Sequence, residues 1–195
     1  MPKRSAEYLN ERREQILAGA RAAFARHGFE ATTIALLEKE IGVSRGAIFH
    51  YWPNKLAIFV DLADRDAERF VSGIPLEGGP EAVVEYWMEQ FVAEPDWIRV
   101  YFEAGRMMRN DAELIRRWRE RSDRFGKPLA EMVRRWQAEG LVRDDLSDEQ
   151  VLTWLFTLTD GLGLQLAWAP EPKPEDYRML PALAAAALAP PTEKM

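Results

Sequence analysis

The segment Ser44-Arg45-Gly46-Ala47 has the composition of a helix end that enters the major groove of DNA. Arg45 carries a planar guanidinium that can donate two hydrogen bonds to one guanine, and the Ser44 hydroxyl can bind a base or a phosphate. Gly46 and Ala47 are small enough for the backbone to approach DNA closely. The alternative interpretation is an ordinary polar helix turn, since short turns of this kind are common in helical proteins.

Further donors follow this segment. Tyr51 and Lys55 supply a hydroxyl and an ammonium that could bind phosphates on either side of the groove. Together with neighbouring polar and small residues, they complete the predicted DNA-binding set, which is Thr32, Thr33, Ser44, Arg45, Gly46, Ala47, His50, Tyr51 and Lys55.

The surrounding pattern predicts the helices that would present these donors. Thr32 or Thr33 can cap a first helix, whose apolar residues recur at helical spacing. Gly42 then allows a tight turn, and Ser44 caps a second short helix, which Pro53 prevents from continuing. A helix, a glycine-containing turn and a capped short helix are the pattern of a helix-turn-helix.

The run 41–52, IGVSRGAIFHYW, preceded by two threonines and followed by Asn54-Lys55, resembles the DNA-binding domain of TetR-family transcriptional repressors. Phe49 stands where that family usually has Tyr, and Trp52 where it usually has Phe, so Phe49 has no hydroxyl for a phosphate. The resemblance spans about residues 10–60. It implies a repressor that binds a palindromic operator in double-stranded DNA as a homodimer and that a small-molecule effector releases or modulates.

The charge distribution agrees with DNA binding at the N-terminal end. Residues 1–60 hold nine Lys/Arg and six Asp/Glu, a net charge of +3, whereas the whole chain has −6 and the remainder therefore −9. With a basic N-terminal part (1–60) and an acidic remainder, the attraction for DNA phosphates is restricted to the N-terminal part. The chain has no cysteine, which excludes disulfides and thiolate metal sites.

The chain should be all-α, with two domains. We expect a three-helix helix-turn-helix domain over 1–55, a linking helix over 54–71, and an effector-binding and dimerisation domain over 72–195. The segment 72–80 holds three Gly and two Pro, which cannot sustain a helix. The expected helices are 7–27, 34–41, 45–51, 54–71, 81–93, 96–109, 111–139 with an interruption near 126–128 left open, 151–168 and 174–189.

The last two expected helices favour dimerisation. Ser147 and Gln150 match a capping box, and the helix that follows is nearly free of charge. It is barely long enough to cross a membrane and contains Thr, Gln and Asp, so we expect burial within protein instead. With an alanine-rich last helix, it would form a four-helix interface between two copies. The N-terminus lacks a signal-peptide pattern, which makes a cytoplasmic location the default.

Aromatic, sulfur-containing and basic side chains in the body could line an effector pocket. The candidates are Trp97, Tyr101, Phe102, Arg106, Arg109, Trp136 and Asp160. The simpler interpretation of each is that aromatic residues form the core and charged residues form surface ion pairs.

A finer resemblance concerns residues 44–50, Leu37-Glu38, Glu103 to Asp111 and Arg117-Trp118, which look like the actinobacterial aconitase-repressor branch. That branch responds to citrate with a divalent metal. The resemblance implies that Arg106 or Arg109 holds carboxylates and that Glu103 or Asp160 helps to hold the cation. No other cofactor is expected.

Two other classes of protein are alternatives to a repressor. An enzyme is disfavoured because the two histidines, His27 and His50, have no nucleophile and carboxylate at a recognisable spacing, and no phosphate-binding loop occurs. The other alternative is a helical dimer that binds a ligand or acts as a scaffold without reading DNA. Arg45, Tyr51 and Lys55 argue against it, because a scaffold has no need for these donors around a turn.

Overall fold

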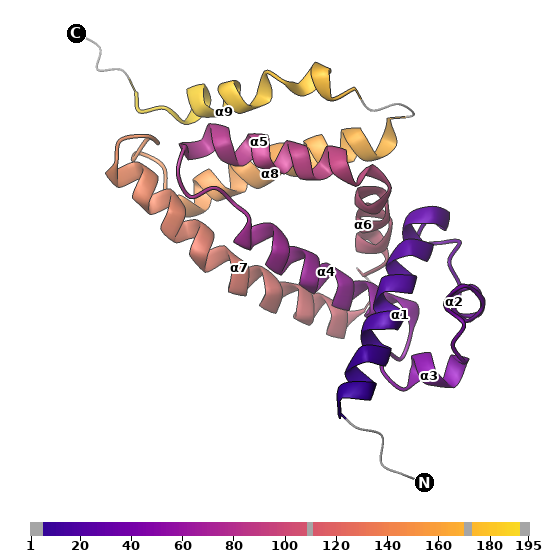
Figure 1. Ribbon diagram of the computed structural model, residues 1–195. Helices are drawn as coiled ribbons and strands as arrows, with labels where there is room; N and C mark the ends of the chain where they lie inside the picture. Colours follow the sequence, from indigo (N-terminus) through magenta and orange to yellow (C-terminus); the bar gives the residue numbers. More distant parts are fainter. Residues whose placement is uncertain (1–5, 109–110, 170–172, 192–195) are drawn as a thin grey trace. The chain divides into compact units, whose positions relative to one another are not determined.

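The computed structural model describes residues 6–108, 111–169 and 173–191, and all regular elements within these ranges are helices (Figure 1). The expected all-α class is confirmed. The elements are α1 (Ala6–His27), α2 (Ile34–Ile41), α3 (Arg45–Phe49), α4 (Lys55–Ser72), α5 (Gly79–Ala93), α6 (Pro95–Met108), α7 (Ala112–Ala138), α8 (Asp148–Trp168), a 3-10 helix (Pro174–Tyr177) and α9 (Leu180–Leu188).

The chain forms two compact units that do not follow the sequence order. Unit 1 comprises Met1–Asp66 and Arg99–Arg119, and unit 2 comprises Ala67–Ile98 and Glu120–Met195. The helices α4, α6 and α7 each contribute residues to both units. Unit 1 therefore contains the helix-turn-helix together with the later part of α6 and the start of α7.

Unit 1 is built around α1, which packs against α2 (Figure 1). Thr33 caps α2 by accepting a hydrogen bond from the backbone N–H of Leu36 at 3.1 Å. Gly42 ends α2 in the left-handed conformation, with φ of 70°, which an L side chain adopts only with strain. Ser44 then caps α3 through Ala47. The predicted helix-turn-helix geometry is thus present.

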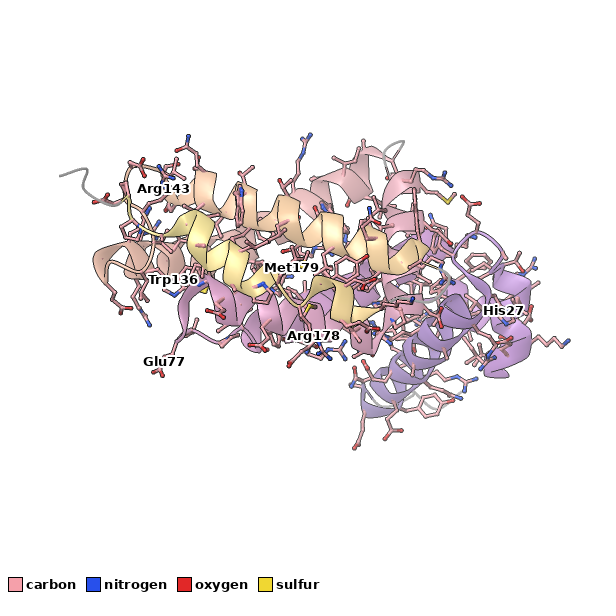
Figure 2. All side chains as sticks on the ribbon, turned by 90° about the horizontal axis from the view of Figure 1, so that it is seen from above. His27, Glu77, Trp136, Arg143, Arg178 and Met179 are labelled. Atoms are coloured by element: carbon pink, nitrogen blue, oxygen red, sulfur yellow. The ribbon has the colours of Figure 1, made fainter. Side chains whose placement is uncertain are left out.

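Unit 2 has an apolar core in which α5 packs against α8 and α9 (Figure 1). Its largest fully buried side chains include Trp87, Trp136 and Leu155. Figure 2 shows Trp136 on α7 within unit 2 and Met179 in the turn that precedes α9. Ser147 and Gln150 form the predicted capping box of α8.

Several expected boundaries differ from the structure: α3 ends at Phe49 and not at residue 51, and α5 begins at Gly79, inside the segment expected to be free of helix. The interruption near 126–128, which the sequence leaves open, is absent. The helix α7 is continuous through Gly126 and Pro128, since buried residues on both sides of this point, Leu114 and Met132 among them, hold the helix against its neighbours. The expected helix 174–189 is instead a 3-10 turn followed by α9. Pro181 stands in the first turn of α9, where its missing N–H costs no hydrogen bond.

Within the described ranges, no helix combines the length and apolarity that crossing a membrane requires.

Candidate nucleic-acid interface

The start of α3 is exposed and rigidly held. The Ser44 hydroxyl accepts a hydrogen bond from the Ala47 N–H at 3.2 Å, and the Arg45 N–H donates to Oε1 of Glu38 on α2 at 3.0 Å. These bonds satisfy two N–H groups that the first turn of a helix leaves unpaired. The side chains of Ser44 and Arg45 face solvent. Apart from adjoining residues and the backbone of α3 itself, no described atom lies within 4 Å of the position a Gly46 Cβ would occupy. A DNA backbone could therefore approach this turn closely.

Other predicted DNA-binding residues near α3 differ in exposure. Thr33 and His50 are exposed, and Ala47 is partly exposed. Tyr51 is half-buried, and its hydroxyl donates to the backbone carbonyl of Leu9 on α1 at 3.0 Å. The hydroxyl oxygen of Tyr51 can still accept a hydrogen bond, but its proton is already donated to Leu9.

Thr32 and Lys55 lie on the inner side of the loop between α1 and α2. Thr32 is fully buried, and its hydroxyl donates to the Gly28 carbonyl at 2.7 Å. The Lys55 ammonium donates to the carbonyls of Phe29, Glu30 and Thr32 at 2.6, 2.9 and 2.8 Å. Burial lowers the pKa of Lys55, an effect that the carboxylates of Glu30 and Glu103 oppose. In this arrangement both side chains hold the loop, and their predicted DNA contacts remain untested.

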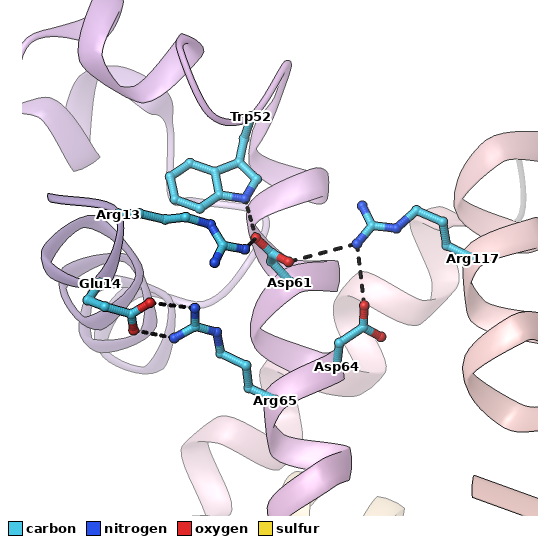
Figure 3. Close-up of polar contacts among 7 residues, drawn as sticks. All are labelled: Arg13, Glu14, Trp52, Asp61, Asp64, Arg65 and Arg117. Carbon is cyan, nitrogen blue, oxygen red and sulfur yellow. Dashed lines mark hydrogen bonds and ion pairs between the residues drawn. The ribbon is translucent and has the colours of Figure 1, made fainter. Parts of the chain in front are cut away.

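The carboxylate of Asp61 on α4 joins three elements of unit 1 (Figure 3). The indole N–H of Trp52, which follows α3, donates to Asp61 at 2.7 Å, and Arg13 of α1 does so at 2.6 Å. Arg117 of α7 lies 3.8 Å from Asp61 and 3.3 Å from Asp64. Because Asp61 is only partly exposed, these charges are less screened than those of a surface pair.

A second contact between α1 and α4 lies beside this network. Both guanidinium nitrogens of Arg65 donate to the carboxylate of Glu14 (Figure 3). The Arg65 hydrogen bonds lower the pKa of Glu14 and outweigh its partial burial, which acts in the opposite direction. Together with the pair between Arg21 and Asp66 at 3.7 Å, the contacts at Glu14 and Asp61 fix the orientation of α1 on α4.

The predicted effector residues divide between the two units. Tyr101, Phe102 and Arg106 belong to unit 1, whereas Trp97, Trp136 and Asp160 belong to unit 2. Trp97 and Trp136 are buried, and Arg106 is exposed and pairs with Glu30 at 2.5 Å. Tyr101 and Phe102 are half-buried. Arg109 lies outside the described residues.

The structure does not test the predicted metal ligands, Glu103 and Asp160, which belong to different units. Glu103 accepts a hydrogen bond from the Phe29 N–H at 2.7 Å in unit 1, and Asp160 lies on α8 in unit 2. Although Asp160 is exposed, neighbouring protein desolvates its carboxyl and raises its pKa. No group of three His, Asp or Glu side chains able to hold a metal occurs in the described part of the chain.

Sequence reasoning missed the structural roles of four residues. Asp61, Glu103 and Arg117 hold the helix-turn-helix in place through partners that lie between 9 and 74 residues away in the sequence. The fourth, Arg121 in unit 2, is only 7% exposed. Its burial could have been suspected, since it continues the buried stripe of α7 formed by Met132 and Trp136 toward the N-terminus at helical spacing.

Comparison with known proteins gives two family matches. The family described as "Bacterial regulatory proteins, tetR family" matches residues 16–62, and "BetI-type transcriptional repressor, C-terminal" matches residues 80–189. The HTH-type transcriptional repressor Rv1474c of Mycobacterium tuberculosis is 38% identical over 89% of this chain and 91% of its own length. The HTH-type transcriptional repressor AcnR of Corynebacterium diphtheriae is 36% identical over 86% of this chain and 87% of its own length.

Solved structures share the fold at lower identity. The fatty acid degradation regulator FadR of Bacillus halodurans has a TM-score of 0.75 at 18% identity and covers 96% of this chain and 98% of its own. A regulator from Saccharomonospora viridis, solved in complex with choline, has a TM-score of 0.72 at 23% identity and covers 89% of this chain and 94% of its own.

Proposed function

Because this chain belongs to the TetR family of bacterial transcriptional regulators, we propose that it binds a palindromic operator as a homodimer and represses transcription. Family membership makes it a regulator and not an enzyme. Its site of action would be the cytoplasm, where the bacterial chromosome lies. A small molecule bound in the C-terminal domain would then release the operator. Its effect on the free energy of operator binding can be no larger than the difference between its binding free energies for the two states of the protein.

The observation that carries operator binding is the exposed first turn of α3. Ser44 and Glu38 fix its backbone, and Arg45 is the long donor at its N-terminal end, which is the end that usually contacts bases in a helix-turn-helix. Direct base contacts by Arg45 and Ser44 are part of the proposal. Contacts by Thr33, Gly46, Ala47, His50 and Tyr51 complete it.

Dimerisation through α8 and α9 is supported by their exposed apolar side chains. Trp168 is 72% exposed, and Leu183 on α9 is 55% exposed. Trp154 and Phe156 on α8 are exposed as well. Large apolar residues concentrated on two helices favour an interface. A two-fold dimer would place two α3 helices about 34 Å apart, or a multiple of this distance, on a palindrome.

For the effector site we propose unit 2, because the BetI-type segment covers most of it. Citrate with a divalent metal, which the AcnR-like branch suggests, stays a prediction. Glu103 accepts the Phe29 N–H through one oxygen, and its part in holding a metal stays a prediction as well.

The test is fluorescence anisotropy of a labelled duplex from the region upstream of the protein's own gene, titrated at several salt concentrations. We expect tight binding that survives competitor DNA and weakens steeply with salt. Arg45→Ala should lose roughly 10- to 100-fold in operator affinity and little in affinity for random DNA, since a bidentate base contact contributes about 1–3 kcal/mol of discrimination.

Lys127→Ala, on the exposed surface of α7 in unit 2, is the matched control because it removes one cation far along the chain from α3. It should bind like the wild type. Equal losses on operator and random DNA for Arg45→Ala would exclude base readout by Arg45. If no duplex is bound, the scaffold alternative replaces the repressor proposal. Adding citrate with Mg²⁺ to the bound complex tests that effector directly.

A further inference from the structure

We infer that Glu103 and Lys55 are positioning residues for operator binding, which act through the loop 28–33 between α1 and α2. This inference rests on the operator binding proposed above. Neither residue lies on α2 or α3, the two helices of the helix-turn-helix. Glu103 is on α6, within the segment that matches the BetI-type C-terminal family, while its partner Phe29 is within the segment that matches the tetR DNA-binding family.

The loop begins at a glycine where a side chain would be strained. Gly28 ends α1 with φ of 79°, and a Cβ at this position would lie 3.2 Å from Oε2 of Glu103. The next residue, Phe29, is fully buried, with ring centroids 5.3 Å from Phe24 and 5.6 Å from Phe59. Its backbone N–H is therefore shielded from water, and Glu103 is the acceptor that satisfies it, at 2.7 Å.

Lys55 fixes the carbonyls of the same loop. An ammonium has three donors, and all three are used by the carbonyls of Phe29, Glu30 and Thr32. The ammonium also lies 4.6 Å from the Phe29 ring centroid, within range of a cation–π contact. Lys55 thus has no donor left for a phosphate in this arrangement. The negative charge of Glu103 partly compensates its burial.

The loop leads directly to the recognition helix through hydrogen bonds. Its last residue, Thr33, caps α2. On the next helical turns of α2, Glu38 accepts the N–H of Arg45, the first residue of α3. A continuous series of contacts therefore runs from Glu103 and Lys55 through the loop and α2 to the proposed base-reading arginine. Contiguous networks of this kind can carry the position of one element to another.

The first test compares variants of Glu103 in operator affinity, in the ratio of operator to random-DNA affinity, and in hydrogen exchange of the Phe29 amide by NMR. Glu103→Met removes the acceptor at similar size. We expect about a tenfold loss of operator affinity and faster exchange at Phe29, because a buried N–H loses its partner. Glu103→Gln retains an acceptor oxygen and should restore most of the affinity, although it removes the same charge.

Two controls separate positioning from charge and from surface pairing. Glu89→Gln, exposed on α5, changes the net charge equally and should bind as the wild type does. Arg116→Ala removes the exposed pair with Glu113 at the start of α7, outside the loop, and should change affinity less than twofold. Should Glu103→Met not fold, Glu103→Asp withdraws the carboxylate by one methylene and takes its place with the same expected direction.

The second test uses the salt dependence of Lys55→Met. A lost phosphate contact lowers the magnitude of the slope of log K against log salt by about 0.9, whereas a loop displacement leaves the number of phosphate contacts nearly unchanged. We expect reduced operator affinity with an unchanged slope. A slope reduced by about 0.9 would overturn the assignment of Lys55.

The remaining outcomes are distinct. Wild-type operator binding together with unaltered binding by folded Glu103→Met would overturn the assignment of Glu103 alone. Slow, unaltered exchange at Phe29 in that variant would show that the hydrogen bond does not hold the loop and would overturn it as well. Failure of the wild type to bind any duplex would instead overturn the proposed function, and this inference with it.

Discussion

Unit 1 and unit 2 both contain buried apolar side chains, and they differ in the polar contacts that accompany this packing. In unit 1, the elements around α3 are joined by charged and hydrogen-bonding side chains, of which Asp61, Lys55 and Glu103 each contact residues distant in sequence. The core of unit 2 is apolar, and there the indole N–H groups of Trp87 and Trp136 are buried without a described acceptor. Polar contacts have preferred directions and fix orientation, whereas apolar contacts depend mainly on buried area.

The difference suggests that contacts in unit 1 mainly set the orientation of the recognition helix, whereas contacts in the core of unit 2 mainly set the stability of the fold. A recognition helix must be held to within a fraction of an ångström for its donors to meet base edges, which directional contacts achieve. A body that accepts a ligand can instead be held by packing that tolerates small displacements of its helices. Substitutions in unit 1 should therefore alter DNA binding more than stability, and substitutions in the core of unit 2 should do the reverse.

The largest expected effect is in unit 2. Leu155→Ala removes a fully buried side chain from the core and should lower the free energy of unfolding by about 2–5 kcal/mol, measured by urea denaturation. The matched control is Leu76→Ala, at 55% exposure in the same unit, which should change it by less than about 0.5 kcal/mol. Similar losses for both would contradict the burial contrast on which the comparison depends.

Asp61→Ala is the corresponding change in unit 1. It leaves the Trp52 indole N–H, on a residue that is only 3% exposed, without its acceptor and removes the partner of Arg13. We expect a stability loss of about 1–3 kcal/mol, accompanied by a loss of operator affinity in the folded protein. Urea unfolding and DNA-binding anisotropy are measured on one preparation of the variant. Unchanged operator affinity at reduced stability would contradict the proposed difference between the units.

Ser44→Ala should have a smaller effect on stability. It removes the cap of α3, which contributes about 1 kcal/mol in typical helices. Ser147→Ala removes the equivalent hydrogen bond from α8 in unit 2 and is its counterpart. The two should lower the thermal midpoint similarly, while only Ser44→Ala weakens operator binding. Weakening by both variants would mean that cap loss acts through general destabilisation.

The smallest effect concerns Asp160 on α8. Desolvation raises the pKa of its carboxyl in the folded protein, so folding is opposed once the pH rises above the unfolded value of 3.8, and this cost is complete above the folded pKa. Asp160→Asn should therefore be slightly more stable than the wild type at pH 7, within the ~0.5 kcal/mol usual for surface changes. The difference should vanish below the unfolded pKa.

Thermal unfolding at pH 7 and pH 3 measures this difference. Asp123→Asn, an exposed residue of α7, provides the comparison because it removes the same charge. An equal gain in Asp123→Asn would assign the effect to net charge instead of to the surroundings of Asp160.

Local features of the fold were predictable because their causes are local. Thr33, Ser44 and Ser147 cap the helices that follow them, and Gly42 has the left-handed conformation that a tight turn requires. By contrast, the continuity of α7 through Pro128 depends on tertiary packing on either side, which outweighs the preference of proline. Local sequence patterns do not reveal that packing.

The candidate interface was predictable in its exposed part only. Ser44 and Arg45 are adjacent in the sequence, so their types and their order indicate the chemistry of α3. The role of Glu103 depends on Phe29, which lies 74 residues earlier. A pair at that separation produces no periodic pattern in a single sequence. The sequence also does not indicate that the aromatic residues predicted to line an effector pocket belong to two different units.

The discontinuity of unit 1 bears on the order in which the protein becomes competent during its synthesis. Residues 6–66 leave the ribosome well before residues 99–119, although both segments build the same unit. Since chains are made at about 5–20 residues per second, the nascent helix-turn-helix waits several seconds for Glu103 and Arg117. During that interval the Phe29 N–H lacks its acceptor and Asp61 lacks Arg117. A ribosome-bound nascent chain would therefore not occupy the operator at full affinity until α6 and the start of α7 have emerged.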